Sequence, residues 1–332
     1  MFSQILQNAN AVDAGIAIGG QINLSRKFIG GDNPIFREAY AAVTKMAGGP
    51  DRICKTELLN LWKDECLTFA AKCLVTLWWG RPNFRVTSRV YSSGNLRKME
   101  TAEFEGSFKA LTDELDLSKF KEGLNALSAK LSREGESHLN GIDISFYTKF
   151  FHFWFASHPP KSCPRYLPVI ADKIMREAVF AEMMDRGEDV NLVFDSNDAY
   201  LRSSSYVAFA DKFNKYADEF GVEPFLLEDK LFNFSRRLGD MYVAAYNRRL
   251  SFSDRITVRY DETECTASVV NEKSKAYLFE GQKARLLAEA ESMRCDNGGN
   301  IDTEEICSRL HCSRFELLSF MKELRDKKII LA

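Results

Sequence analysis

The sequence lacks the features of a membrane protein, a secreted protein or a strongly basic nucleic-acid-binding protein. Its apolar stretches, 66–79 and 144–156, are too short or too interrupted to cross a bilayer. The first twenty residues contain no basic segment leading into a long apolar one, which argues against a signal peptide. The formal net charge is only -2, so any surface for a polyanion must be a local patch. We therefore expect a cytoplasmic protein with no membrane partner.

Metal-binding patterns are also missing. The chain has eight cysteines but no CxxC, and the pair Cys307 and Cys312 has no second pair at zinc spacing. Its four histidines have no acidic partners at metal-ligand spacing. We therefore predict no metal site and no cofactor, and we expect the cysteines to be reduced and mostly buried.

The sequence does show the periodicity of α-helices, and the chain is longer than one compact core accommodates. The chain has 332 residues, and we predict a mostly α protein with three parts: an irregular, partly helical arm at 1–50, a helical core at 51–250 and a C-terminal domain at 251–332. Apolar spacings of three and four predict core helices over 55–80, 102–133 (two helices), 144–155, a segment opening after 168, 205–219 and 224–248. Alternation of apolar and polar residues predicts strands within 252–280. The pieces FRVT and SRVY within 81–98 are also rich in residues that favour strands.

The C-terminal segment TEEICSRLHCSRFELLSFMKELRDKKIILA resembles the helix-turn-helix of winged-helix domains. Its turn falls at His311-Cys312, and Ser313 is placed to cap the second helix. If the domain binds DNA, Arg314 and its neighbours would face the groove. The alternative is a module that packs helices or contacts another protein.

The stretch GIDISFYTKFFHFWF, Gly141 to Phe155, holds seven aromatic rings and a single lysine, Lys149. Lysine is rarely buried, so Lys149 is either a solvated charge at the edge of a core helix or a nucleophile in an apolar pocket. The next loop, ASHPPKSCPRYLP, has four prolines and cannot be helical. Asp172 then lies near the start of another helix.

This order of elements resembles the helix-hairpin-helix DNA glycosylase superfamily, and best its 8-oxoguanine glycosylase-like branch, which includes the archaeal GO-glycosylase type. The family's L-x-G-[IV]-G hairpin corresponds to Leu139 to Asp143, and its P-V-D-x-H element to the segment from Pro168 to Met175. Ser145 occupies the usual lysine position, and Lys149 lies one helical turn later. A bacterial subgroup's later motif corresponds to Ser205 through Phe232, so the resemblance covers about 50–248.

The resemblance implies a helix-hairpin-helix fold and a DNA glycosylase that flips out a damaged or modified base and cleaves its N-glycosidic bond. Asp172 would stabilise the oxocarbenium charge, and Lys149 would be the Schiff-base nucleophile if it is desolvated. Candidate base-pocket residues, chosen by ring size and neighbourhood, are Trp78, Trp79, Phe146 and Trp154. The iron–sulfur cluster of some relatives needs four closely spaced cysteines, which are missing after Asp172.

Double-stranded DNA is the implied partner, which would associate the protein with a bacterial nucleoid. Backbone N–H groups of the hairpin and the following helix would bind a phosphate, at Gly141, Ile142, Ile144 and Ser145. The second hairpin glycine is replaced by Asp143, a poor neighbour for a phosphate, which we expect to cap the helix instead. Basic residues of 81–98 would compensate; the candidates are Arg81, Arg85, Arg89 and Lys98, with Lys173 beyond them.

Three functions stay open at this point. The enzyme could excise 8-oxoguanine and cleave the strand as an AP lyase in DNA repair. It could instead be monofunctional and act on modified bases of phage DNA, as an antiviral defence; Asp143, the displaced lysine and the extra domain motivate this alternative. The third is a non-catalytic DNA-binding regulator that retains the fold.

Overall fold

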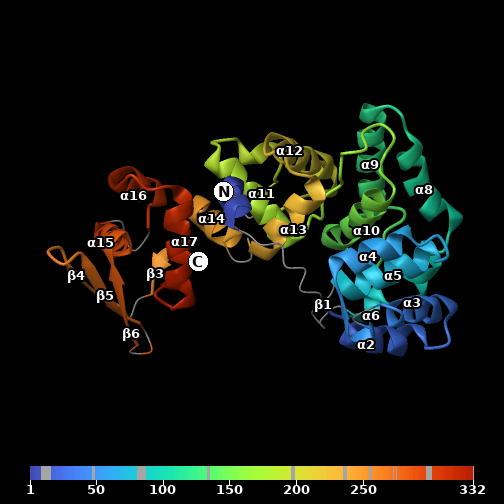
Figure 1. Cartoon of the computed structure of the whole chain (residues 1–332), viewed down its shortest axis with the longest axis horizontal. Coiled ribbons are helices and arrows are strands. Elements are labelled where there is room, and N and C mark those ends of the chain that lie inside the picture. The colour runs from blue at the N-terminus through green and yellow to red at the C-terminus, as the bar shows by residue number, and fades with distance from the viewer. Residues whose placement is uncertain are drawn as a thin grey trace. The chain divides into compact units, whose positions relative to one another are not determined.

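The computed structural model describes the whole chain except 9–15, 47–48, 81–86, 133–134, 196–198, 235–237, 254–255, 272, 274, 297–300 and 332. It is mostly α, as predicted (Figure 1). The chain forms two compact units that interleave along the sequence. The central unit comprises Leu6–Met175 and Leu201–Asn233, and the terminal unit comprises Met1–Ile5, Arg176–Tyr200 and Phe234–Ala332. The predicted domain borders near 50 and 250 stay a prediction.

The central unit is built of helices, with one two-stranded ladder between β1 (Ile16–Ala17) and β2 (Arg52–Ile53) among its described residues. The helices are α2 (Gly19–Ile29), α3 (Pro34–Thr44), α4 (Lys55–Lys63), α5 (Phe69–Gly80), α6 (Thr87–Val90), α7 (Ser93–Met99), α8 (Ala102–Asp113), α9 (Leu117–Leu131), α10 (Ile144–Ser157), α12 (Tyr206–Glu219) and α13 (Pro224–Phe234).

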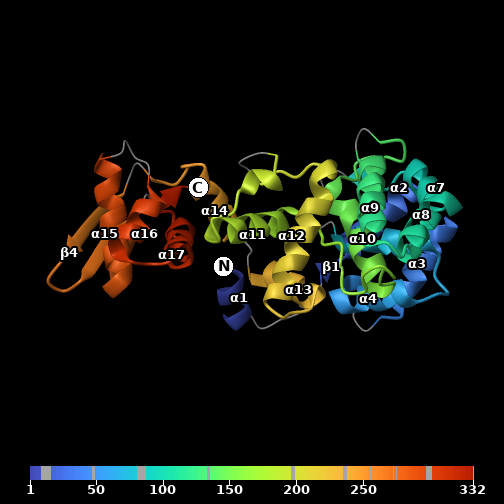
Figure 2. The same ribbon diagram turned by 90° about the horizontal axis from the view of Figure 1, so that it is seen from above.

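The core of this unit is centred on α10, which is buried on every side from Tyr147 to Phe155. A helix that is apolar all round is stable only inside a core, and α10 contacts α4, α5, α8 and α9. Its neighbour α9 lies beside it in both views (Figure 2). Rings of Trp62, Phe69 and Trp154 pack edge-on or tilted, with centroids 5.5 to 6.4 Å apart. This dense aromatic packing fixes the helix that carries Lys149.

Three local predictions differ from the structure. The expected helix over 55–80 is two helices, because the Thr68 N–H donates to the Glu38 carboxylate at 2.6 Å rather than continuing the helical ladder. The expected helix over 224–248 is likewise divided into α13 and α14 (Gly239–Tyr246). Within SRVY, the residues up to Val90 belong to helix α6 rather than to a strand.

The terminal unit combines helices with small antiparallel sheets. Strands β4 (Thr257–Asp261), β5 (Thr266–Val270) and β6 (Ala276–Glu280) form a sheet in that order beside α15 (Gly281–Asp296) (Figure 1). Strands β3 (Ser251–Phe252) and β7 (Ile330–Leu331) pair separately. The other helices are α1 (Phe2–Asn8), α11 (Lys173–Asp185), α14, α16 (Thr303–Leu310) and α17 (Arg314–Asp326); α1 and α11 continue into the central unit.

The helix-turn-helix of the C-terminal segment forms as predicted. His311 ends α16 in the left-handed conformation, with φ of 49°. Ser313 caps α17 in a capping box with Glu316, each side chain bonding the other's backbone N–H. None of the described helices is long and apolar enough to span a membrane.

Candidate active site

Lys149 is buried in the central unit, with 5% of its surface exposed. Its Nζ donates a hydrogen bond to the Ser145 carbonyl oxygen at 2.6 Å. The same nitrogen lies 3.8 Å from Asp172 Oδ2 and 5.1 Å from the centre of the Phe146 ring. Lys149 is therefore not a solvated charge at the edge of a core helix; its role as a nucleophile stays a prediction.

Asp172 lies just before α11, and its two carboxylate oxygens have different surroundings. Oδ1 accepts the backbone N–H of Met175 at 3.1 Å, as a helix cap does. Oδ2 faces the Lys149 amine. The side chain is 18% exposed, so the carboxylate lies at the edge of the buried region. One oxygen holds the residue in place while the other faces the amine.

The segment that leads to Asp172 is fixed from both sides by side-chain hydrogen bonds. Thr148 of α10 accepts the Ala171 N–H at 3.0 Å. Tyr206 of α12 donates to the Val169 carbonyl at 2.9 Å. Asn214 of α12 bonds both the N–H and the carbonyl of Leu167, each at 2.9 Å. A segment without secondary structure is therefore held to the same helix that carries Lys149.

One turn beyond Lys149, a buried polar cluster contains Lys55, His152 and Glu228. Lys55 forms an ion pair with Glu228 and lies over the Phe225 ring, 4.0 Å from its centre. His152 Nε2 lies 3.2 Å from a Glu228 oxygen, and Nδ1 lies 3.3 Å from the Pro168 carbonyl. Burial, together with the charge of Lys55, lowers the pKa of His152 well below its usual value. The ring is therefore neutral at pH 7.

The sequence does not predict this cluster as a unit. Glu228 falls within the motif from Ser205 to Phe232, and Lys55 begins a predicted helix. One signal in the sequence is that Glu228 lies among the apolar residues of α13. A carboxylate that is buried with such residues requires a partner for its charge. Its partners are distant in sequence, so no local pattern identifies them.

The hairpin before α10 is anchored by a single buried amide. Asn95 accepts the Asn140 N–H at 2.8 Å and donates to the Asn140 carbonyl at 2.9 Å. The same side chain donates to the carbonyls of Arg89 and Val90. Gly141 has φ of 72°, and an added Cβ would lie 3.2 Å from Arg89 Cβ. Arg89, Val90 and Asn95, from the described part of the basic segment, therefore pack against the hairpin.

Asp143 caps α10, as the sequence predicts. Its Oδ1 accepts the backbone N–H of Ser145 at 3.1 Å and the Ser145 hydroxyl at 2.5 Å. The Ile142 N–H donates to the Leu139 carbonyl at 2.9 Å. Two of the N–H groups predicted to meet a phosphate, those of Ile142 and Ser145, are thus already engaged inside the protein.

The other predicted DNA-binding residues have varied positions. Arg89 and Lys173 are exposed, and Ile144 is half-buried. Lys98 Nζ donates to the His138 carbonyl at 2.6 Å, next to the hairpin. Arg81 and Arg85 lie outside the described residues.

Among the four predicted base-pocket residues, only Phe146 lies beside Lys149. Trp78 is fully buried and donates its indole N–H to Ser25 at 2.9 Å. Trp79 packs edge-on against Phe153, and Trp154 donates to Thr112 at 2.8 Å within the aromatic core. All three tryptophans are core residues by burial and contacts. Ring size, the basis of the prediction, does not distinguish a core residue from a pocket residue.

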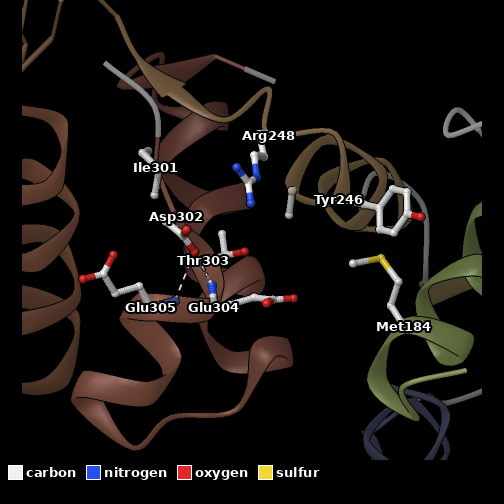
Figure 3. Close-up of a pocket in the computed structure, with 9 residues that line it drawn as sticks. Met184, Tyr246, Arg248, Ile301, Asp302, Thr303, Glu304 and Glu305 are labelled. Atoms are coloured by element: carbon white, nitrogen blue, oxygen red, sulfur yellow. Dashed lines mark hydrogen bonds between the residues drawn. The ribbon is translucent and has the colours of Figure 1, made fainter. Parts of the chain in front are cut away.

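A pocket of about 550 Å³ lies elsewhere, within the terminal unit (Figure 3). Its lining includes Asp302, Glu304 and Glu305, and the Asp302 carboxylate already accepts the N–H groups of the other two residues. This acidic lining does not suit a nucleic acid, and none of the predicted site residues belongs to it. Among the described residues, no group of three or more metal-ligating side chains comes together.

Comparison with known proteins identifies a family. The sequence model of the family described as "Putative 8-oxoguanine DNA glycosylase OGG-like protein" matches residues 45–232, more than half of the chain. No curated protein and no solved structure gives a significant match. The matched range contains the hairpin, α10, Lys149, Asp172 and Glu228.

Proposed function

Since the chain belongs to this family of OGG-like proteins, we propose that it is a DNA glycosylase that excises 8-oxoguanine, with Asp172 and Lys149 as its catalytic residues. The observation that supports the proposal most directly is the buried Lys149 amine at 3.8 Å from an Asp172 carboxylate oxygen. A desolvated lysine amine can form a Schiff base, and a carboxylate beside it can stabilise positive charge that develops on the sugar.

In the proposed reaction, the neutral Lys149 amine forms a bond to C1′ of the flipped nucleotide. The bond between C1′ and the base breaks, and the base leaves with the electron pair and takes up the proton that the attacking nitrogen loses. Asp172 Oδ2 stabilises the positive charge that develops on the sugar. Opening of the sugar ring then gives the Schiff base, from which the 3′ phosphate is lost by elimination in the lyase step.

Borohydride trapping tests this proposal on a duplex that carries 8-oxoguanine opposite cytosine. The reagent reduces the Schiff base to a stable amine, so the wild-type protein should become covalently linked to DNA. Lys149→Ala should abolish the adduct, whereas Lys119→Ala, at an exposed lysine of α9, should leave it unchanged. Asp172→Asn should slow base release by about 10²–10³-fold, the range for removing one electrostatic contact to a transition state.

Two results would count against the assignment. Undiminished base release by Asp172→Asn would overturn the role of the carboxylate. Base release without any trapped adduct would point to a monofunctional enzyme in which water replaces the amine. A protein that binds DNA but releases no base, modified phage bases included, would be a regulator.

A further inference from the structure

The C-terminal end of α5 approaches α10 closely at the position of Lys149. Trp79 packs against Phe153 at a ring distance of 5.4 Å and fixes this end of the helix. At the next residue, Gly80, an added Cβ would lie 2.9 Å from Lys149 Cδ and 3.0 Å from Cε. It would also lie 3.4 Å from a ring carbon of Phe146. The Lys149 stem thus occupies the space that any other residue at position 80 would fill.

We propose that Gly80 is a positioning residue that acts through Lys149, an inference that rests on the proposed function. The Lys149 stem lies between the Gly80 backbone and Phe146, and its amine is directed toward Ser145 O and Asp172 Oδ2. A methyl group at position 80 would displace Cδ and Cε, and with them the amine. Displacement by about 1 Å can slow a reaction by about 10²-fold.

The same geometry predicts little harm to the fold. Gly80 is helical and has no positive φ, so the backbone accepts alanine. The colliding atoms belong to the end of a flexible side chain and not to backbone. A substitution should therefore affect chemistry more than stability, which distinguishes a positioning residue from a merely structural one.

The test compares Gly80→Ala with Gly106→Ala, a control in helix α8 where an added Cβ meets nothing within 4 Å. For Gly80→Ala we expect trapping and single-turnover base release on the 8-oxoguanine duplex to fall by about 10- to 100-fold. Its DNA affinity and melting temperature should stay near those of the wild type. Gly106→Ala should match the wild type in trapping, base release and DNA affinity, and its melting temperature should be equal or higher because alanine favours a helix interior.

A double-mutant cycle with Lys149→Ala shows whether Gly80 acts through the lysine. In the Lys149→Ala background, Gly80→Ala should have no further effect on residual base release. An equal loss in both backgrounds, or normal trapping by Gly80→Ala, would overturn the inference while leaving the proposed function intact. Base release by the wild type without trapping would overturn the role of the amine and this inference together.

Discussion

Two buried lysines of the central unit, Lys55 and Lys149, have different partners. Lys55 faces the buried Glu228 carboxylate and an aromatic ring, which together compensate its charge fully inside the core. Lys149 faces a backbone carbonyl and the partly exposed Asp172. One amine is enclosed with its counter-charge, and the other faces a carboxylate at the edge of the core. This difference supports the proposed role of Lys149 in the reaction.

Sequence alone could place Lys149 among aromatic rings and Asp172 at a helix start, since both depend on local pattern. It could not pair Lys55 with Glu228 or bring Gly80 against Lys149, because these contacts join residues far apart in the chain. The tryptophans show the same limit. Their size suggested that they line a pocket, but their packing places them in the core.

His152 should make the stability of the protein depend on pH. Burial lowers its folded-state pKa, so below about pH 6.5 the unfolded chain binds more protons than the folded one. The contribution of neutral His152 to the free energy of unfolding should therefore be fully present above that pH. It should fall as the solution is acidified, by at most about 1.4 kcal/mol per pH unit. The side chains of Lys55, Glu228 and Lys149 are the titratable groups that lie near the ring.

Urea unfolding between pH 5 and 7 measures the effect. His152→Asn keeps a donor toward the Pro168 carbonyl but has no titration, so its slope should be smaller than that of the wild type. His311→Asn, at an exposed histidine, serves as the control and should retain the wild-type slope. Equal slopes for all three proteins would contradict the prediction.

Among the elements, the start of α10 combines a helix cap with the predicted phosphate site. Asp143 caps the N-terminus of α10 but brings a negative charge to the surface that we expect to bind phosphate. Asn95 holds the backbone of Arg89 beside the hairpin, and the exposed Arg89 side chain adds a positive charge to this part of the chain. A helix cap follows from local sequence, so the Asp143 cap could be predicted. The hydrogen bonds of Asn95 to the hairpin join distant residues, so only the tertiary structure reveals them.

Replacing Asp143 separates its two effects. Asp143→Asn keeps a good cap and removes the charge, so DNA affinity at low salt should rise by about fivefold, the value of one weak charge contact of about 1 kcal/mol, with stability unchanged. Asp143→Ala should show the same gain in affinity but lose about 1 kcal/mol of stability. Fluorescence anisotropy at two salt concentrations and urea unfolding provide the two measurements. Unchanged affinity in both variants would place the DNA away from this hairpin.

At the scale of the whole molecule, the predicted family and the mostly α class are confirmed. The division into compact units could not be predicted, because the terminal unit gathers three separate stretches of chain. Arg314 illustrates the consequence. It was predicted to face DNA if the helix-turn-helix binds it, yet its guanidinium donates to the Met184 carbonyl at 2.7 Å and to Glu304 at 3.2 Å, within the terminal unit.

We therefore expect Arg314→Ala to act on stability and not on DNA binding. Loss of hydrogen bonds from a charged group should cost about 1–3 kcal/mol of unfolding free energy. Its DNA affinity should equal that of the wild type, and Lys322→Ala, further along α17, should also leave affinity unchanged. A several-fold loss of affinity in both variants would instead identify α17 as a recognition helix.

The segment before Asp172 has a consequence for the rate at which its backbone exchanges hydrogen with solvent. Leu167 and Ala171 belong to no helix or strand, yet their N–H groups are bonded to buried side chains. Exchange at these positions requires α10 or α12 to separate from the segment, and not merely a loop to move. Their amides should exchange as slowly as those of a core helix, and Asn214→Ala should speed the exchange of Leu167 long before it unfolds the protein.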